Sequence, residues 1–192
     1  MTGPEAAALP LHEWEGFYVI VGTSAAALTG LMFVVIAIVA DAGPRAASPR
    51  GIATFLTPTI VHFCMALLIS AILSARWPRH LEVQIILALV SIGGFIYTLV
   101  VLRRAFGVTN YALVLEDWIW HVVLPTFAYA LSLGASLWLE SMTPLALLLV
   151  GGASVLLLLI GIHNAWDTVE YLILQRMQRE QEKTVNNPPP PV

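Results

Sequence analysis

The sequence predicts an all-α integral membrane bundle of five transmembrane helices. Hydrophobic residues make up 58% of the 192 residues and charged residues only 11%, and the mean hydropathy is +0.82. Soluble domains carry about 25% charged residues, so this composition is that of a membrane protein. Five apolar runs also reach the roughly 20 residues that a helix needs to cross a hydrocarbon layer of ~30 Å.

The five expected spans are residues 16–40, 51–73, 83–102, 113–139 and 144–174. The first span has no charged residue, and the fifth starts at Pro144, a residue type favoured in a first helical turn. Residues 1–15 are expected to form an extracytoplasmic segment. Residues 175–192, charged and then rich in proline, are expected to form a disordered cytoplasmic tail. An odd number of spans places the two termini on opposite sides.

The distribution of Lys and Arg predicts the orientation, because cytoplasmic connections retain positive charge. On the amino-terminal side of the predicted topology there are only Arg76 and Arg79. The other side holds Arg45, Arg50, Arg103, Arg104, Arg176, Arg179 and Lys183. We therefore expect the N-terminus outside and the C-terminus in the cytoplasm. The first sixteen residues lack the positively charged region of a secretory signal, so the first run is expected to remain as a membrane anchor.

Several functional classes find no support in the sequence. The net charge is −3 and the basic residues form no stripe along a helix, so we expect no nucleic-acid partner. The nucleotide motif GxxxxGK[ST], the nucleophile elbow GxSxG and the zinc motif HExxH do not occur. No reaction follows from the sequence, and whether the protein is an enzyme stays open.

The first apolar run carries a resemblance. The stretch LHEWEGFYVIVGTSAAALTGLMFVVIAIVAD resembles those of uncharacterised small bacterial membrane proteins, and this implies no activity. The expected location is the bacterial cytoplasmic membrane, with the lipid bilayer as the partner.

Small residues recur every four positions on three of the predicted helices, which permits close backbone approach in a membrane. The stripes are Gly22, Ala26 and Gly30; Ala66, Ser70 and Ser74; and Ala128, Ser132 and Ser136. They predict a compact bundle, and they motivate the hypothesis of a homo-oligomer. Tryptophans near the span ends, Trp118, Trp120 and Trp166 among them, are interpreted as interfacial anchors.

A polar cluster is expected where the fourth and fifth helices meet the cytoplasm. Asp117 and His121 are four residues apart, as are His163 and Asp167, and Glu170 follows on the same face. The short loop after the fourth helix predicts antiparallel neighbours, so the reversed order sets His beside His and Asp beside Asp. A further polar residue, His62, is expected near the midplane and facing the bundle interior.

Three interpretations of these residues stay open. The cluster and His62 form a proton or ion pathway, whose weak point is an outer half without ionisable residues. Alternatively, His62, His121, His163, Asp117 and Asp167 bind a transition metal or haem, although the spacing matches no known ligand motif. In the third interpretation the side chains satisfy one another and fix helix register in a structural or regulatory scaffold.

Overall fold

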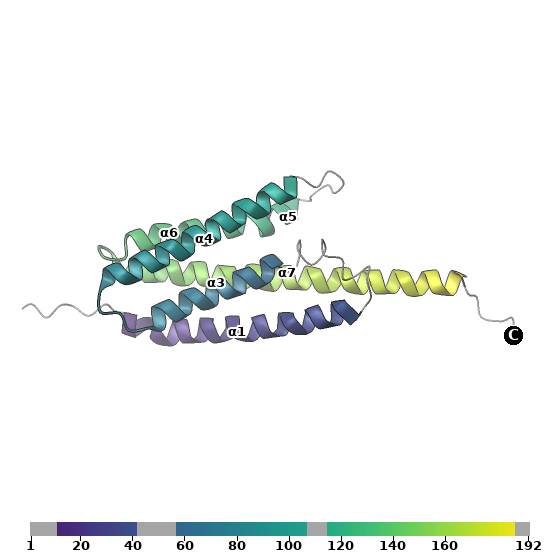
Figure 1. The fold of residues 1–192 in the computed structure, drawn as a ribbon, viewed down its shortest axis with the longest axis horizontal. Helices are drawn as coiled ribbons and strands as arrows, with labels where there is room; N and C mark the ends of the chain where they lie inside the picture. The colour runs from purple at the N-terminus through teal and green to yellow at the C-terminus, as the bar shows by residue number, and fades with distance from the viewer. Residues whose placement is uncertain (1–10, 42–56, 107–114, 187–192) are drawn as a thin grey trace, which may run out of the picture.

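The computed structural model describes residues 11–41, 57–106 and 115–186, and every regular element in them is helical (Figure 1). The elements are α1 (Leu11–Asp41), α3 (Thr57–Ser74), α4 (His80–Phe106), α5 (Leu115–Trp118), the π-helix η2 (Ile119–Val123), α6 (Leu124–Leu137) and α7 (Thr143–Asn186). Five candidate membrane spans lie within them: His12–Ile38, Thr57–Ser74, His80–Arg103, Ile119–Leu137 and Thr143–Glu170. The predicted fold class is confirmed.

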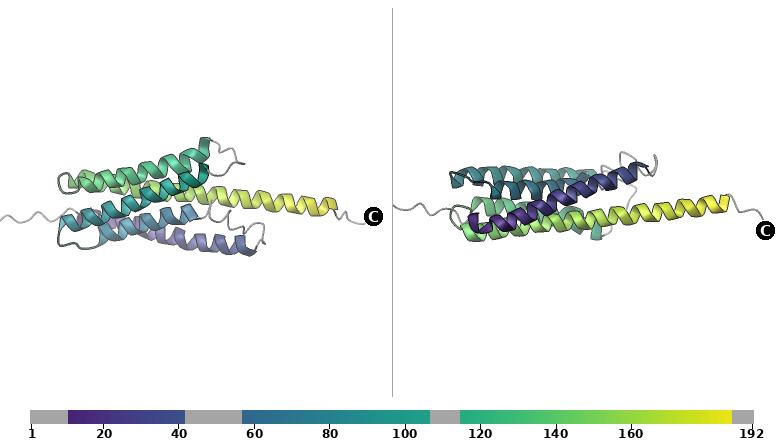
Figure 2. Two further views of the ribbon diagram at one scale, coloured as in Figure 1. Left: turned by 45° about the horizontal axis from the view of Figure 1, so that its top comes forward. Right: turned by 90° about the horizontal axis from the view of Figure 1, so that it is seen from below.

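The helices form one elongated bundle in which α7 runs along α1, α3 and α6 (Figures 1 and 2). Helix α4 packs against α3 and α6, so α3, α4, α6 and α7 form a ring with α3 and α6 on opposite corners. Helix α1 lies outside this ring, mainly against α3. We call the end with the α6–α7 turn (Trp138–Met142) the turn end, and the end where α7 passes Glu170 the C-terminal end.

The bundle is apolar outside and partly polar inside, the opposite of a water-soluble protein. Large hydrophobic side chains such as Ile20, Phe33 and Phe127 are more than half exposed. The buried polar residues among those described are Thr59, His62, Ser70, Ser91, Thr98, Ser132, Ser136, Ser154, Asn164 and Thr168. Because the fatty chains of a bilayer solvate apolar side chains, this distribution fits helices that cross a membrane.

Glycines let aromatic side chains fill the spaces between helices. An added Cβ on Gly94 would lie 2.3 Å from the Tyr129 ring, and one on Gly161 would lie 2.3 Å from the Phe63 ring. The adjacent Gly93 lies in open space, since an added Cβ there would meet nothing within 4 Å. Gly94 and Gly161 therefore fix how closely α4 approaches α6 and how closely α3 approaches α7.

The predicted small-residue stripes have different positions in the bundle. Ala128, Ser132 and Ser136 are all buried, and so are Ala66 and Ser70. On α1 only Gly22 is buried, against Ser70, whereas Ala26 and Gly30 are exposed. Two stripes thus pack inside the protein, while most of the α1 stripe faces outward.

Helix α7 continues well past its apolar span, to Asn186. Residues 175–186, which the sequence analysis assigned to a disordered tail, belong to this helix. The physical reason is their composition: Gln, Arg, Met, Glu and Lys dominate them, and all are strong helix formers. These residues are charged and have no core to pack against, but they only extend a helix that has already formed, and extension is much easier than nucleation.

Some expectations concern residues outside the described ranges. They are the segment 1–10, the start of the second span at 51–56 with the nearby Arg45 and Arg50, the start of the fourth span at 113–114, and the proline-rich end at 187–192. The side chain of Asp117 also lies outside the described part, although its backbone belongs to α5.

Candidate functional site

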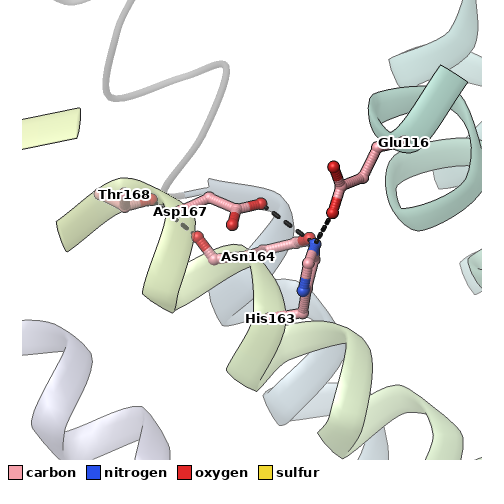
Figure 3. A network of polar contacts seen from close by, with 5 residues as sticks. All are labelled: Glu116, His163, Asn164, Asp167 and Thr168. Atoms are coloured by element: carbon pink, nitrogen blue, oxygen red, sulfur yellow. Dashed lines mark hydrogen bonds and ion pairs between the residues drawn. The ribbon is translucent and has the colours of Figure 1, made fainter. Parts of the chain in front are cut away.

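The first part of the candidate site is a cluster of charged groups at the C-terminal end (Figure 3). The Nε2 atom of His163 lies 3.3 Å from Oδ2 of Asp167, one turn further along α7. The same Nε2 lies 3.9 Å from Oε1 of Glu116 on α5. Both carboxylates are well exposed, with 40% of the Asp167 side chain and 70% of the Glu116 side chain accessible. One ring nitrogen therefore faces two solvated carboxylates from two helices.

A tryptophan holds the imidazole of His163 in place. The rings of Trp120 and His163 are stacked, with centroids 3.8 Å apart and planes 19° from parallel. Trp120 lies in the π-helix Ile119–Val123, in which the N–H of Leu124 donates to the carbonyl of Ile119, five residues back. Pro125 explains this turn, because proline has no N–H for the carbonyl of His121 and its ring crowds that carbonyl.

The π-turn separates the predicted cluster residues into different environments. The expected pairing of His163 with Asp167 is confirmed, but the ring stacked on His163 is that of Trp120, which we had interpreted as an anchor. His121 is half-buried and near enough to His62 to interact electrostatically. Glu170 is exposed and makes no ion pair or hydrogen bond with another described residue. The layer of Asp117 and Asp167 stays a prediction.

The second part of the site lies at the centre of the bundle. His62 is 2% exposed, which confirms that it faces the interior, and its Nδ1 lies 2.9 Å from the hydroxyl oxygen of Tyr129. Tyr129 lies about 15 Å from Ile119 and about 12 Å from Leu137 at the helical rise, so the pair is near the middle of that span. The bond joins α3 to α6 across the ring of helices.

Serine hydroxyls continue the polar groups toward the turn end. Ser91 on α4 donates to Oγ of Ser132 on α6 at 2.9 Å, and both side chains are buried. Ser136 is buried one turn further along α6. Beyond it, Nε2 of Gln84 donates to the carbonyl of Leu137 at 3.1 Å. These groups follow the α4–α6 seam.

Asn164 adds a buried polar side chain at the level of the charged cluster. It is 2% exposed, and neither its side-chain oxygen nor its side-chain nitrogen has a hydrogen-bond partner among the described residues. It lies on α7 between Gly161, which faces Phe63, and Asp167 of the charged cluster. Its own carbonyl accepts a hydrogen bond of 2.9 Å from Thr168, drawn in Figure 3. Asn164 directly follows His163 on α7, so it lies at the level of His163, about 1.5 Å nearer to Asp167 along the helix.

We name these residues the polar column: Glu116 and Asp167; then Asn164 and His163; then His62 and Tyr129; then Ser91 and Ser132; then Ser136 and Gln84. On α6 the levels of Tyr129, Ser132 and Ser136 are three and four residues apart, or about 4.5–6 Å. One bridging water that makes two hydrogen bonds of ~2.8 Å spans about this distance. On α4, Gln84 and Ser91 are seven residues apart, or about 10.5 Å.

Sequence reasoning missed Glu116, Trp120, Tyr129, Ser91, Gln84 and Asn164 as site residues. For Asn164 a signal exists, since an amide within an apolar run costs free energy unless it is satisfied or used. For Tyr129 and Ser91 no such signal exists, because a Tyr or Ser is common in membrane helices and only tertiary packing joins them to partners.

The metal hypothesis gains no support from the geometry. Within the described residues, no three side chains of His, Cys, Asp and Glu come together as a group that could hold a metal ion. His62 is hydrogen-bonded to a tyrosine, and Nε2 of His163 lies 3.3 and 3.9 Å from two carboxylates that are partly or largely solvated. No family model, curated protein or solved structure matches the chain.

Proposed function

We propose that this protein is a proton-conducting protein of the bacterial cytoplasmic membrane, and that the polar column is its path. The observation that carries the proposal is the succession of buried polar groups at several levels along the apolar bundle. Polar groups inside a membrane protein are costly and most often lie along substrate or proton pathways.

The central pair has the chemistry for a proton relay. A neutral imidazole has one N–H and one acceptor nitrogen, so His62 either accepts a hydrogen bond from Tyr129 at Nδ1 or donates one there. When a proton binds at Nε2, the proton at Nδ1 passes to the Tyr129 oxygen as the hydroxyl releases its own proton onward. Each group ends with its original number of protons, and the imidazole resets by changing its tautomer.

The charged cluster supplies protons at the cytoplasmic end. Glu116 and Asp167 are in contact with solvent and attract cations to His163, whose ring Trp120 holds facing both carboxylates. Asn164, at the level of His163, offers a donor and an acceptor to buried water beside the cluster, and water would continue the path from there to His62. The orientation, with the C-terminal end in the cytoplasm, rests on the distribution of Lys and Arg.

Purified protein in liposomes containing a pH-sensitive dye tests the proposal. A potassium diffusion potential drives protons inward, and the rate is compared with empty liposomes. We expect flux in the wild type, and a fall of about tenfold or more in Tyr129→Phe and His62→Leu, since a positioned proton-transfer group contributes ~100-fold or more. Ser154→Ala is the matched control, because this buried serine bonds only within α7, to the carbonyl of Val150.

The scaffold interpretation predicts a different result. The direct bonds of His62 to Tyr129 and of Ser91 to Ser132 also tie neighbouring and opposite helices together. If the wild type gives no flux above empty liposomes, while Tyr129→Phe lowers thermal stability, the column serves to fix helix register instead.

The exposed part of the α1 stripe, Ala26 and Gly30, supports a homo-oligomer, which the mass of the protein in mild detergent tests.

A further inference from the structure

The polar column does not end at Gln84. His80 lies one turn before Gln84 on α4, so the two side chains share a face, and Gln84 on that face contacts Leu137 at the end of α6. Nδ1 of His80 and Oε1 of Gln84 are both buried, and neither has a hydrogen-bond partner among the described residues. Each of the two remains partly exposed as a whole residue.

Two orphan polar atoms one turn apart form a built site for a small hydrogen-bonding ligand. A buried nitrogen or oxygen without a partner is costly, so native proteins usually satisfy such atoms, often with water. The turn spans about 6 Å at the helical rise, which one water with two hydrogen bonds bridges. Gln84 is already held by the carbonyl of Leu137, so its oxygen has a fixed position.

His80 is also the ionisable residue that the turn-end half of the path needs. Its imidazole contacts both the bundle interior and the solvent, because Nδ1 is buried whereas the residue as a whole is partly exposed. The charged residues near it in the chain and in the adjoining turn are Arg79, Glu82 and Glu140, and none of them forms an ion pair with His80 within 4.0 Å. A proton taken up from solution is therefore not held in a salt bridge.

We propose that His80 and Gln84 form the turn-end port of the polar column, with a water or hydronium held between Nδ1 of His80 and Oε1 of Gln84. This inference rests on the proposed proton conduction. A proton binds at the exposed nitrogen of His80 while Nδ1 releases one to the held water, and the water passes a proton toward Ser136 and Ser132. After the transfer, each group carries the same number of protons as before.

The test is proton flux in liposomes for His80→Gln and Gln84→Leu, with His12→Gln as the matched control. His12 is an exposed histidine at the same end of the bundle, on α1 and outside the column. We expect a fall of about tenfold or more in both port variants and none in the control, since glutamine keeps polarity and size but exchanges no proton as imidazole does. Thermal melting in detergent verifies that each variant is folded.

Chemical rescue gives a readout that a structural role would not move. In His80→Ala, added imidazole should restore flux several-fold, whereas it should not restore flux in Tyr129→Phe. Flux equal to wild type in folded His80→Gln overturns the port and leaves the proposed conduction standing. Absence of flux in the wild type overturns both. If His80→Gln does not fold, rescue of His80→Ala and the flux of Gln84→Leu decide the question.

Discussion

Nδ1 of His62 on α3 lies 2.9 Å from the hydroxyl oxygen of Tyr129 on α6, so the central polar contact joins two helices at opposite corners of the bundle. Gly94 makes this contact possible, because a side chain there would occupy the space of the Tyr129 ring. A polar bond and a close helix approach therefore depend on one another at the middle of the spans.

A double-mutant cycle on this pair should reveal direct coupling. His62→Leu and Tyr129→Phe each leave a buried partner unsatisfied, so each should lower the free energy of unfolding by about 1–3 kcal/mol. The double variant should lose less than the sum, by about 0.6–1.7 kcal/mol, the range for polar pairs in membrane helices. Unfolding in mixed micelles measures the four proteins. Strict additivity would show that the two side chains act independently.

Two adjacent glycines give a matched test of packing. Gly94→Ala should lower the free energy of unfolding by about 1–3 kcal/mol, because its Cβ overlaps the Tyr129 ring and forces the helices apart. Gly93→Ala should be neutral or stabilising by up to about 1 kcal/mol, since its Cβ meets nothing within 4 Å and alanine favours a helix. Equal effects of the two substitutions on the melting temperature would contradict the described packing.

Asn164→Leu should separate stability from function. It removes two buried atoms without partners, so the free energy of unfolding should stay constant or rise by about 1–3 kcal/mol. Proton flux should nevertheless fall by about tenfold or more, because buried water beside His163 loses the donor and the acceptor that hold it. A stable variant that conducts like the wild type would remove Asn164 from the path.

The carboxylates at the C-terminal end should matter for flux more than for stability. Glu116→Gln and Asp167→Asn should change the free energy of unfolding by less than about 1 kcal/mol, because exposed ion pairs contribute little. The same variants should slow flux, most clearly at low ionic strength, where attraction of cations reaches furthest. Glu170→Gln is the control, as its exposed carboxylate has no contact with His163. A control as slow as the two variants would argue against a specific role.

The sequence predicted the features that depend on local spacing or on composition. The five spans follow from hydropathy and length, and the contact of His163 with Asp167 follows from four-residue spacing on one helix. The bond between His62 and Tyr129 was not predicted, because it depends on how α3 and α6 are placed around the ring.

The stacking of Trp120 on His163 was missed for a different reason. Face assignments on the fourth span assumed α-helical hydrogen bonds, whereas Ile119–Val123 is a π-helix with an extra residue in its turn. Pro125 is visible in the sequence, but a proline in a helix ends it, kinks it or produces such a turn, and the surroundings decide which. The orphan atoms of Asn164, His80 and Gln84 also depend on packing that spacing does not specify.

The length of α7 sets how far Asn186 lies beyond the apolar span. From Glu170, where the apolar span ends, to Asn186 the helix rises about 24 Å along its axis. The Debye length at physiological ionic strength is about 8 Å, so the charge of anionic lipid headgroups is screened over about three such lengths before Asn186. Arg176, early in this extension, lies within range of a charged membrane surface, whereas a molecule that met the helix near Asn186 would experience the ionic environment of the bulk solution.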